Sequence, residues 1–423
     1  MKDIVNQFKG VVSQERTRIR RQAADKVIAR RLRQKKAQKE PVNVVFVCHR
    51  PAVWESLHSV YDALVADPHF HVTIVAIPNK VELPGVWFDH EEYHSEGAEE
   101  FWKDYGCING YNYETGEWLD LKELKPDYVF FQQPYNVTRC PAYRSKAVSR
   151  YARIAYIDYF VPLAFGEIYV ECTPADYLRD LSFFFTQNEK DTAFIQNRFK
   201  SIPENKCAVV NTGFPRYDHI QDYANSECSF WNDQNSFKII WTPRWTTNEG
   251  NCHFFDYKDS FTRLCKDMPE IELAFRPHPQ AFKEWEFTGE FTKEQREAYL
   301  REFEHSNMHL DQSGNYLPLL FHSDCLVTDR SSIITDYLCT YKPVIYCAGT
   351  DSAGSTVDIE EAYLNAMYTV KDWHELREVL DMLMHHEDPL LQTRKETVEQ
   401  YFGIGTQHAA ENVKKILLAD AMK

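Results

Sequence analysis

The sequence lacks any hydrophobic run approaching the roughly 20 apolar residues of a membrane span. Its first residues, MKDIVNQFKG, lack the apolar core of a secretory signal, so we expect a cytosolic protein. None of the 11 cysteines forms a C-x-x-C pair, which argues against zinc ribbons, redox dithiols and a disulfide framework. No Asp-x-Asp pair is present to hold a metal–nucleotide complex, and no cofactor is expected. The chain has 63 acidic residues (Asp and Glu) and 48 basic residues (Lys and Arg), and the resulting net charge of −15 disfavours nucleic-acid binding.

Basic residues are nevertheless concentrated at the start of the chain. The first 40 residues hold 13 basic and four acidic side chains, a net charge of +9, and the other 383 residues carry −24. Apolar residues recur in this segment at helical spacing: Ile4, Val5, Phe8, Val11 and Val12, then Ile19, Ala23, Val27, Ile28 and Leu32. Such a basic amphipathic helix over residues 1–40 can lie on an anionic membrane, where each cation contributes about 1 kcal/mol. It can equally be solvated or pack on the acidic body.

From Val42 onward, short β-rich runs alternate with helical patterns. The strand-like runs are VNVVFVCH, FHVTIVAIP, DYVFFQQ, ARIAYIDYF, SFFFTQN and CAVVNTG, followed by FKIIWTP, IELAFRP, DCLVTD and PVIYCAG. This rhythm predicts an α/β fold with open parallel sheets covered by helices. A polar stretch at about residues 221–236 divides the runs into two similar groups.

The two groups predict two Rossmann-like domains that face a central cleft. We assign residues 41–220 to an N-terminal acceptor domain and residues 221–395 to a C-terminal donor domain. Residues 396–423 are expected to form a C-terminal helix that packs on either half.

The most informative stretch is DCLVTDRSSIITDYLCTYKPVIY. A strand is expected to end at Asp329, and Ser331 and Ser332 then stand where a helix begins. Hydroxyls and free backbone N–H groups at a helix start can hold a phosphate. Asp336, one turn further on, would accept hydrogen bonds from a sugar or polyol hydroxyl. The alternative is that a serine only caps the helix.

Cations follow three further predicted strands. Arg276 and His278 follow one strand, with Pro277 and Pro279 fixing the backbone around the histidine. Such a pair suits diphosphate binding and proton transfer, although a rigid turn would have the same sequence. Arg244 and Trp245 follow the strand FKIIWTP, and Arg216 follows CAVVNTG; the tryptophan offers a face for a base or ring.

Together these stretches resemble the CDP-glycerol glycerophosphotransferase family, teichoic-acid and capsule enzymes of GT-B-like fold. The matching motifs are Gly213-Phe-Pro-Arg216, Pro243-Arg-Trp245, Arg276-Pro-His278-Pro, and Asp329-Arg-Ser-Ser through Asp336-Tyr337 with Lys342-Pro343. The resemblance implies transfer of an alditol phosphate, either glycerol or ribitol phosphate, from a CDP-activated donor to an acceptor hydroxyl, with release of CMP. The acceptor would be a polyol phosphate or a glycan, which can be lipid-linked. The residues implied for the donor pocket are Arg216, Arg244, Trp245, Arg276, Pro277, His278, Ser331, Ser332 and Asp336.

One family motif is missing. Members carry a Trp-His-Gly segment whose histidine serves as a catalytic base, whereas the corresponding strand here, ARIAYIDYFVPL, has no histidine. Asp158 and His49 are the candidate replacements in this domain, and His278 would stabilise or protonate the leaving phosphate. The departure points to a diverged, capsule-type branch.

Three other functions stay open. A GT-B glycosyltransferase would share the architecture but use a nucleotide sugar and break a sugar C–O bond. A catalytically silent scaffold of a capsule-assembly complex would bind the donor without turnover. An isomerase built on the same two-domain plan is the third.

Overall fold

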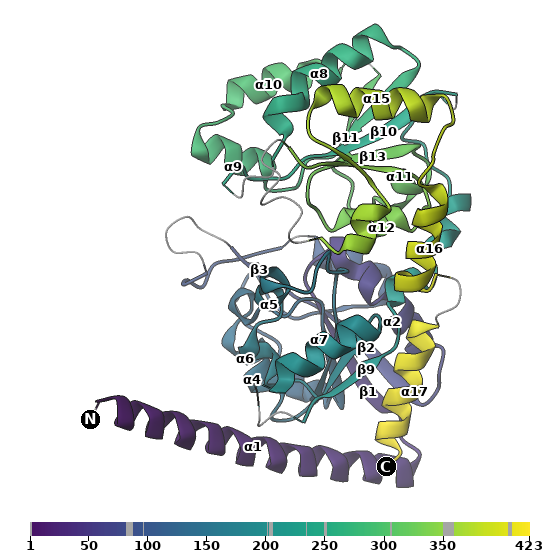
Figure 1. The fold of residues 1–423 in the computed structure, drawn as a ribbon. Helices are drawn as coiled ribbons and strands as arrows, with labels where there is room; N and C mark the ends of the chain where they lie inside the picture. The colour runs from purple at the N-terminus through teal and green to yellow at the C-terminus, as the bar shows by residue number, and fades with distance from the viewer. Residues whose placement is uncertain are drawn as a thin grey trace. The chain divides into compact units, whose positions relative to one another are not determined.

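The computed structural model describes residues 2–81, 88–95, 97–200, 202, 206–233, 235–248, 252–304, 307–349, 359–404 and 408–423, with side chains from residue 19 onward. The chain divides into two compact units (Figure 1). The first holds residues 1–160, 167–218 and 405–423, and the second holds residues 161–166 and 219–404.

The first unit is built on a parallel sheet whose described strands run in the order β5-β2-β1-β6-β7-β8-β9. The strands are β1 (Val42–Cys48), β2 (Phe70–Ala76), β5 (Ile108–Asn109), β6 (Tyr128–Phe131), β7 (Arg153–Ile157), β8 (Phe183–Thr186) and β9 (Ala208–Asn211). A separate antiparallel pair is formed by β3 (Asn79–Lys80) and β4 (Tyr93–His94). The sheet strands β1, β6 and β8 are almost wholly buried, as parallel strands covered on both faces must be.

Helices cover this sheet. They are α2 (His58–Val65), α3 (Ala98–Phe101), α4 (Ser145–Val148), α5 (Glu167–Cys172), α6 (Ala175–Leu178), α7 (Glu189–Lys200) and α17 (Ala409–Ala421). The C-terminal helix α17 packs beside α2 (Figure 1), and the Tyr128 hydroxyl donates a 2.6 Å hydrogen bond to Asp420 of α17. The last helix of the chain therefore belongs to the first unit.

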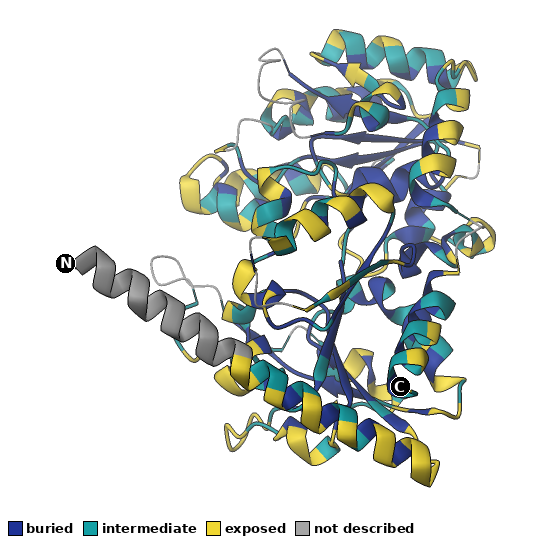
Figure 2. Cartoon of the chain, turned by 60° about the horizontal axis from the view of Figure 1, so that its bottom comes forward, coloured by how far each residue is buried: buried dark blue, intermediate teal, exposed yellow. Residues whose placement is uncertain are grey.

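The basic N-terminal segment forms one long helix, α1 (Lys2–Gln38), whose later turns pack on the first unit. Ala24, Ile28 and Leu32 are buried at a spacing of four residues, and Figure 2 shows buried and exposed positions alternating along this part of the helix. Lys35 and Arg31 each lie 2.7 Å from the fully buried carboxylate of Asp127. This half of α1 thus packs on the acidic body, one of the alternatives open from the sequence.

The predicted apolar face of this helix is only partly the packed one. Ile19 and Val27 are 55% and 64% exposed, so they face away from the body. The side chains of the earlier apolar residues, Ile4, Val5, Phe8, Val11 and Val12, lie outside the described part of the structure.

The second unit has the strand order β12-β11-β10-β13-β14-β15, with all pairs parallel. The strands are β10 (Phe237–Thr242), β11 (Ile271–Phe275), β12 (Met308–Leu310), β13 (Cys325–Thr328), β14 (Val344–Cys347) and β15 (Tyr368–Val370). Counted along the chain this is the Rossmann order 3-2-1-4-5-6, which reverses between β10 and β13. Ligands of such sheets bind beyond the carboxyl ends of the strands at that reversal, called the switch point below.

The helices of the second unit surround its sheet (Figure 1). They are α8 (Phe254–Asp267), α9 (Ala281–Thr288), α10 (Lys293–Arg301), α11 (Leu317–Phe321), α12 (Ile333–Leu338), α14 (Glu361–Asn365), α15 (Trp373–Met384) and α16 (Leu391–Phe402). The helix α8 buries Phe254, Tyr257, Phe261 and Leu264, an apolar stripe at helical spacing.

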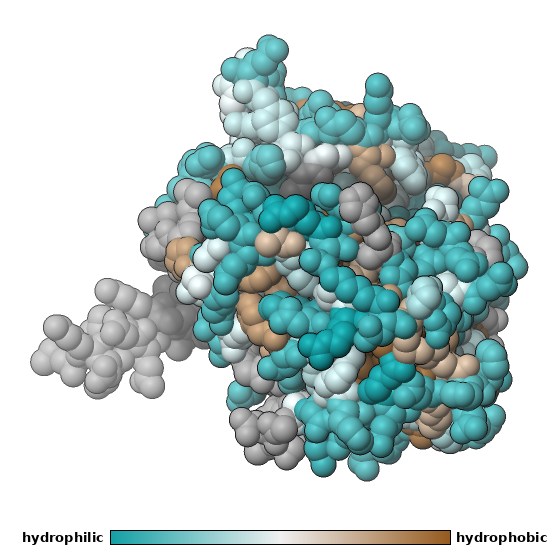
Figure 3. Space-filling view, turned by 90° about the horizontal axis from the view of Figure 1, so that it is seen from above, coloured by the Kyte–Doolittle hydropathy of each residue, from teal (hydrophilic) through white to brown (hydrophobic). Residues whose placement is uncertain are grey.

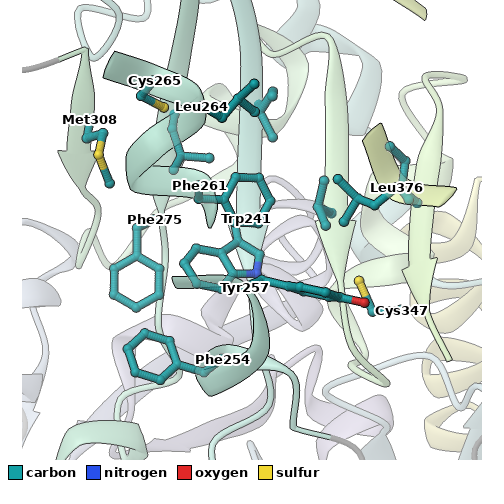
Figure 4. Packing of buried hydrophobic residues seen from close by; sticks show 14 of the residues in the cluster. Trp241, Phe254, Tyr257, Phe261, Leu264, Cys265, Phe275, Met308, Cys347 and Leu376 are labelled. Atoms are coloured by element: carbon teal, nitrogen blue, oxygen red, sulfur yellow. The ribbon is translucent and has the colours of Figure 1, made fainter. Parts of the chain in front are cut away.

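An aromatic core fixes α8 against the sheet. The ring centroid of Trp241, on β10, lies 4.6 Å from that of Phe261 and 5.0 Å from that of Phe275 (Figure 4). Phe254, at the start of α8, stacks on Trp285 of α9 at 4.3 Å. This packing holds rigidly the strand β10 whose carboxyl end leads into the switch point.

Among the described residues, no helix is long and apolar enough to cross a membrane. The face of the molecule seen in Figure 3 is mostly hydrophilic, and its hydrophobic residues form small, separate patches.

Candidate active site

Two loops meet at the switch point of the second unit. Strands β10 and β13 are paired up to their last residues, where the hydroxyls of Thr242 and Thr328 lie 2.7 Å apart. The loop after β10 begins with Pro243 and continues to Arg244, and the loop after β13 begins with Asp329. The backbone N–H of Arg244 donates a 2.7 Å hydrogen bond to the Asp329 carboxylate, which ties the two loops together.

Asp329 also holds His253, a residue that the sequence analysis did not identify. The His253 backbone N–H lies 3.0 Å from one carboxylate oxygen, and its ring Nδ1 lies 2.6 Å from the other. On the far side of the ring, a Cβ at position 349 would lie 2.5 Å from His253 Nε2, so Gly349 permits the ring to sit there. The glycine also has a φ of +69°, which favours the absence of a side chain. The pair His253–Asp329 therefore braces the backbone that carries Arg244.

The pKa of His253 predicts a pH-dependent contribution to stability. Burial lowers this pKa, but the hydrogen bond and charge of Asp329, with the charge of Asp256, outweigh burial and raise it above its usual value. Because the folded-state pKa is the higher one, protonated His253 stabilises the fold below about pH 6.5, and this contribution is lost as the pH rises through the raised value.

Urea unfolding of the wild type and of a His253→Gln variant tests this. The substitution is expected to lower the free energy of unfolding more at about pH 5.5 than at about pH 8.5. An equal loss at both pH values would show that the imidazolium–carboxylate pair contributes nothing.

A second network lies at the carboxyl end of the neighbouring strand β11. The Arg276 guanidinium pairs with Asp311, donates to the Ser313 backbone oxygen at 3.1 Å, and lies over the ring of Tyr316 at 4.5 Å. The hydroxyl of Tyr316 in turn donates a 2.7 Å hydrogen bond to Asp336 of α12. The structure therefore connects Arg276 and Asp336, two of the predicted site residues, through an aromatic ring. Asp311 and Tyr316 were not identified from the sequence.

Ser331 and Ser332 follow β13 directly and precede α12. Ser332 occupies the N-cap position, with Asp336 in the first turn of α12, but its hydroxyl makes no capping hydrogen bond. Neither serine hydroxyl bonds to any residue in the described part of the chain, and Ser332 is exposed. Both hydroxyls can therefore donate to a ligand.

The motif after β11 places an imidazole beside an indole. The His278 and Trp245 ring centroids lie 6.0 Å apart with an interplanar angle of 34°. His278 is exposed, while Pro277 before it is buried and fixes the turn. His278 Nδ1 accepts a 3.3 Å hydrogen bond from the backbone N–H of Gln280.

The remaining predicted site residues belong to the first unit. Arg216 is buried in a single 3₁₀ turn, Pro215–Tyr217, and the Pro215 carbonyl accepts a 2.8 Å hydrogen bond from Ser59. Its part in donor binding stays a prediction.

His49 lies at the switch point of the first sheet, between β1 and β6. It is 1% exposed, its backbone N–H donates to the Gln132 side chain at 2.7 Å, and its ring Nε2 lies 3.0 Å from Gln133. The glutamines belong to the segment that follows β6, so the structure gathers three polar side chains at this edge of the sheet.

Asp158 follows β7 and is fully buried. The Tyr169 hydroxyl donates to Asp158 and lies 2.8 Å from Asp191, so one phenol bridges two carboxyl groups. Burial raises the pKa of both carboxyls, and for Asp158 the nearby charge of Asp191 adds to it. A raised pKa suits a proton acceptor near neutral pH, but a general base must also reach the acceptor hydroxyl. The base role therefore stays a prediction.

Solved structures with this fold include two groups of proteins. MnaA of S. aureus, solved with UDP, is 14% identical, with 90% of this chain and 98% of that chain covered and a TM-score of 0.59. UDP-GlcNAc 2-epimerase from Neisseria meningitidis, bound to UDP-GlcNAc, is 15% identical over 90% and 100% of the chains, with a TM-score of 0.55. The wall teichoic acid polymerase TagF is 15% identical over 99% and 98%, with a TM-score of 0.56. These similarities confirm the predicted GT-B-like α/β fold.

The family comparison covers most of the second unit. Residues 175–419 match the family described as CDP-Glycerol:Poly(glycerophosphate) glycerophosphotransferase, whereas no curated protein matches the chain. The match includes all four motifs on which the resemblance was based and spans more than half of the chain. The protein therefore belongs to the CDP-glycerol:poly(glycerophosphate) glycerophosphotransferase family and is a transferase.

Proposed function

We propose that this transferase moves glycerol phosphate from CDP-glycerol to an acceptor hydroxyl during synthesis of a bacterial cell-surface polymer, a teichoic acid or a capsule, and releases CMP. The observation that supports this best is the set of groups around one switch point: two serine hydroxyls without a described partner, Arg244 and, one strand away, Arg276 with His278. Hydroxyls, backbone N–H groups and guanidinium groups are what a diphosphate needs.

In this proposal the donor lies over the carboxyl ends of β10, β11 and β13. Ser331 and Ser332 hold the diphosphate oxygens with Arg276, and Trp245 packs against the nucleotide or the alditol. Asp336 accepts a hydrogen bond from an alditol hydroxyl. Its bond to Tyr316 already orients that carboxylate for such a contact.

The reaction is a phosphoryl transfer. The acceptor oxygen forms a bond to the phosphorus that carries the glycerol, and the bond from that phosphorus to the bridging oxygen breaks, so CMP leaves. The acceptor proton passes to a base in the first unit, for which Asp158 and His49 are the candidates. His278 stabilises or protonates the departing phosphate. Catalysis then depends chiefly on positioning and on cations that face the phosphoryl oxygens.

Product analysis tests this function. The protein is incubated with CDP-glycerol, CDP-ribitol, UDP-GlcNAc and GDP-mannose, each with a polyol-phosphate acceptor, and the released nucleotide is identified. CMP release with phosphate retained in the product is expected for CDP-glycerol. Release of UDP or GDP would show a glycosyltransferase, and donor binding without turnover over a wide acceptor panel would favour a scaffold.

We also propose that α1 attaches the protein to an anionic membrane surface. Lys26, Arg30 and Arg33 are exposed on the side of the helix that bears Val27, which is 64% exposed. Cations beside an exposed apolar residue match the surface of a bilayer with negative lipids. Arg31, which is half-buried, and Lys35, which is buried, pair with Asp127 and take no part.

Charge reversal tests the attachment without disturbing the packed face of α1. A Lys26→Glu/Arg30→Glu/Arg33→Glu variant is expected to bind vesicles containing phosphatidylglycerol at least about tenfold more weakly than the wild type. Sedimentation with vesicles at low ionic strength measures this. Reversal of Lys103 and Lys200, exposed elsewhere on the same unit, serves as the control. Unchanged binding of the triple variant would exclude this part of α1 as the anchor.

A further inference from the structure

The first unit contains a basic cavity outside the predicted site residues. It has a volume of about 330 Å³ and lies between the loop after β6, the start of α4 and the end of α6. Its charged lining residues are Arg144, Lys146, Arg179, Asp176 and Asp180. This volume falls within the range of small-molecule sites, about 300–1,000 Å³.

A smaller hollow adjoins the cavity and extends its positive charge toward α1. It shares Lys146 and Asp180 with the cavity and adds Arg20 and Arg21 of α1 and Arg150. Together the two hollows are lined by six basic and two acidic side chains, a net charge of +4, in a chain whose overall charge is −15. Such a local excess attracts anions.

Both acidic residues of the lining accept hydrogen bonds from neutral donors, and Asp180 also interacts electrostatically with Arg21 and Arg179. Asp180 is 7% exposed and accepts a 2.8 Å hydrogen bond from the Ser145 hydroxyl. Asp176 accepts a 2.9 Å hydrogen bond from the Asn136 amide, whose oxygen accepts from the Ser145 backbone at 2.9 Å. These hydrogen bonds connect the loop after β6, α4 and α6, which together form one wall of the cavity. The shape of this wall is therefore fixed by contacts within the first unit.

Three cations of the lining form no ion pair with a carboxylate in the described part of the chain, although Arg179 interacts electrostatically with Asp180. Lys146, Arg150 and Arg179 are exposed, and no carboxylate in the described ranges lies within 4.0 Å of their charged nitrogens. Arg21, in contrast, is held by the backbone oxygens of Arg179 and Leu181, which orients α1 against this wall. The cavity therefore presents an excess of positive charge from short segments that these hydrogen bonds hold together.

We propose that this cavity binds a phosphate group of a polyol-phosphate chain, the acceptor of the transferase. The identity of the ligand as a polyol-phosphate chain rests on the proposed function, whereas the binding of a phosphate group is argued from the residues that line the cavity. Guanidinium and ammonium groups arranged around a recess bind a phosphodiester by charge-assisted hydrogen bonds. A recess can enclose a single phosphate group on a flexible polymer more easily than it can contact the flat surface of a bilayer. Because the polymer repeats its phosphates, a long acceptor could bind the cavity through one phosphate while its end reacts elsewhere.

Direct binding of a labelled synthetic oligo(glycerol phosphate), followed by fluorescence anisotropy at low ionic strength, tests the proposal. A Lys146→Gln/Arg179→Gln variant is expected to bind about tenfold or more weakly than the wild type. A matched control, Lys103→Gln/Lys200→Gln, removes the same charge from exposed positions of the same unit and is expected to bind within about twofold of the wild type. Asp176→Asn, which keeps the acceptor for Asn136 but removes a negative charge, is expected to bind more tightly.

The other outcomes overturn the proposal. If both double variants lose affinity equally, the oligomer responds only to net charge. If Lys146→Gln/Arg179→Gln keeps the oligomer but loses vesicles of phosphatidylglycerol, the cavity takes a lipid headgroup instead. Absence of binding to the wild type also excludes the site. A CDP-glycerol titration of the same proteins keeps the two proposals apart: the double variant is expected to bind the donor like the wild type, and failure of the wild type to bind it would contradict the proposed function but not the phosphate site.

Discussion

Replacing His278 by alanine is expected to lower the rate of transfer from CDP-glycerol at least about a hundredfold, with the fold intact. The loss is expected because the exposed imidazole stabilises or protonates the departing CMP in the proposed reaction. The fold should survive because His278 is exposed; its ring lies 6.0 Å from that of Trp245 and accepts a 3.3 Å hydrogen bond from Gln280. Steady-state rates of CMP release measure the effect, and circular dichroism checks the fold.

His374 provides a matched control for this substitution. It is an exposed histidine of the same unit, near the start of α15, and it follows β15 and not β10, β11 or β13. His374→Ala is expected to leave the rate within about twofold of the wild type. Activity of His278→Ala within a few-fold of the wild type would remove His278 from the mechanism.

The second large effect is expected from removing both serine hydroxyls. In a Ser331→Ala/Ser332→Ala variant, the dissociation constant of CDP-glycerol should rise by about tenfold to a thousandfold, because each hydroxyl bond to a charged phosphate contributes about 1.5–3 kcal/mol and the two contributions need not add. Stability should change little, since neither hydroxyl bonds to a described residue. Isothermal titration calorimetry measures the binding.

Ser260→Ala, on α8 of the same unit, is the control and should bind the donor unchanged. Tight binding by the double serine variant would contradict a diphosphate at this helix start. A parallel loss of thermal stability would instead show that the serines matter for folding.

Much of the sheet could be predicted from the sequence because buried parallel strands are continuous apolar runs. VNVVFVCH and FKIIWTP are such runs, and both are central strands, β1 and β10. The strands of the two large sheets that were missed are short and lie at the sheet edges: β5 has two residues, and β12 and β15 have three each. Segments such as MHL and YTV carry too few positions for a periodicity to be read.

The site was predictable where one loop carries the motif and not where partners are distant in sequence. Ser331, Ser332 and Arg276 each follow a recognisable strand end. His253 was missed because its partner, Asp329, lies 76 residues away, and Tyr316 was missed because its link to Arg276 is a ring contact formed only in the folded chain. Pairings of this kind depend on strand order, which the sequence does not state.

Helix α1 illustrates the same limit for an amphipathic segment. Its helical periodicity could be recognised in the sequence, but the buried face is formed by Ala24, Ile28 and Leu32 together with the ion pairs to Asp127. Asp127 lies 92 residues from Lys35 along the chain. The face that packs therefore depends also on a distant carboxylate, which the helical periodicity of the segment does not reveal.

The most direct measurement is a calorimetric titration of the whole protein with CDP-glycerol, CDP and UDP-GlcNAc, repeated with the Ser331→Ala/Ser332→Ala variant. If the carboxyl ends of β10, β11 and β13 hold the diphosphate of a cytidine donor, CDP-glycerol will bind, UDP-GlcNAc will not, and the variant will lose affinity for CDP-glycerol and CDP alike. Preferential binding of UDP-GlcNAc, or donor binding that is unaffected by loss of the two hydroxyls, would contradict that assignment.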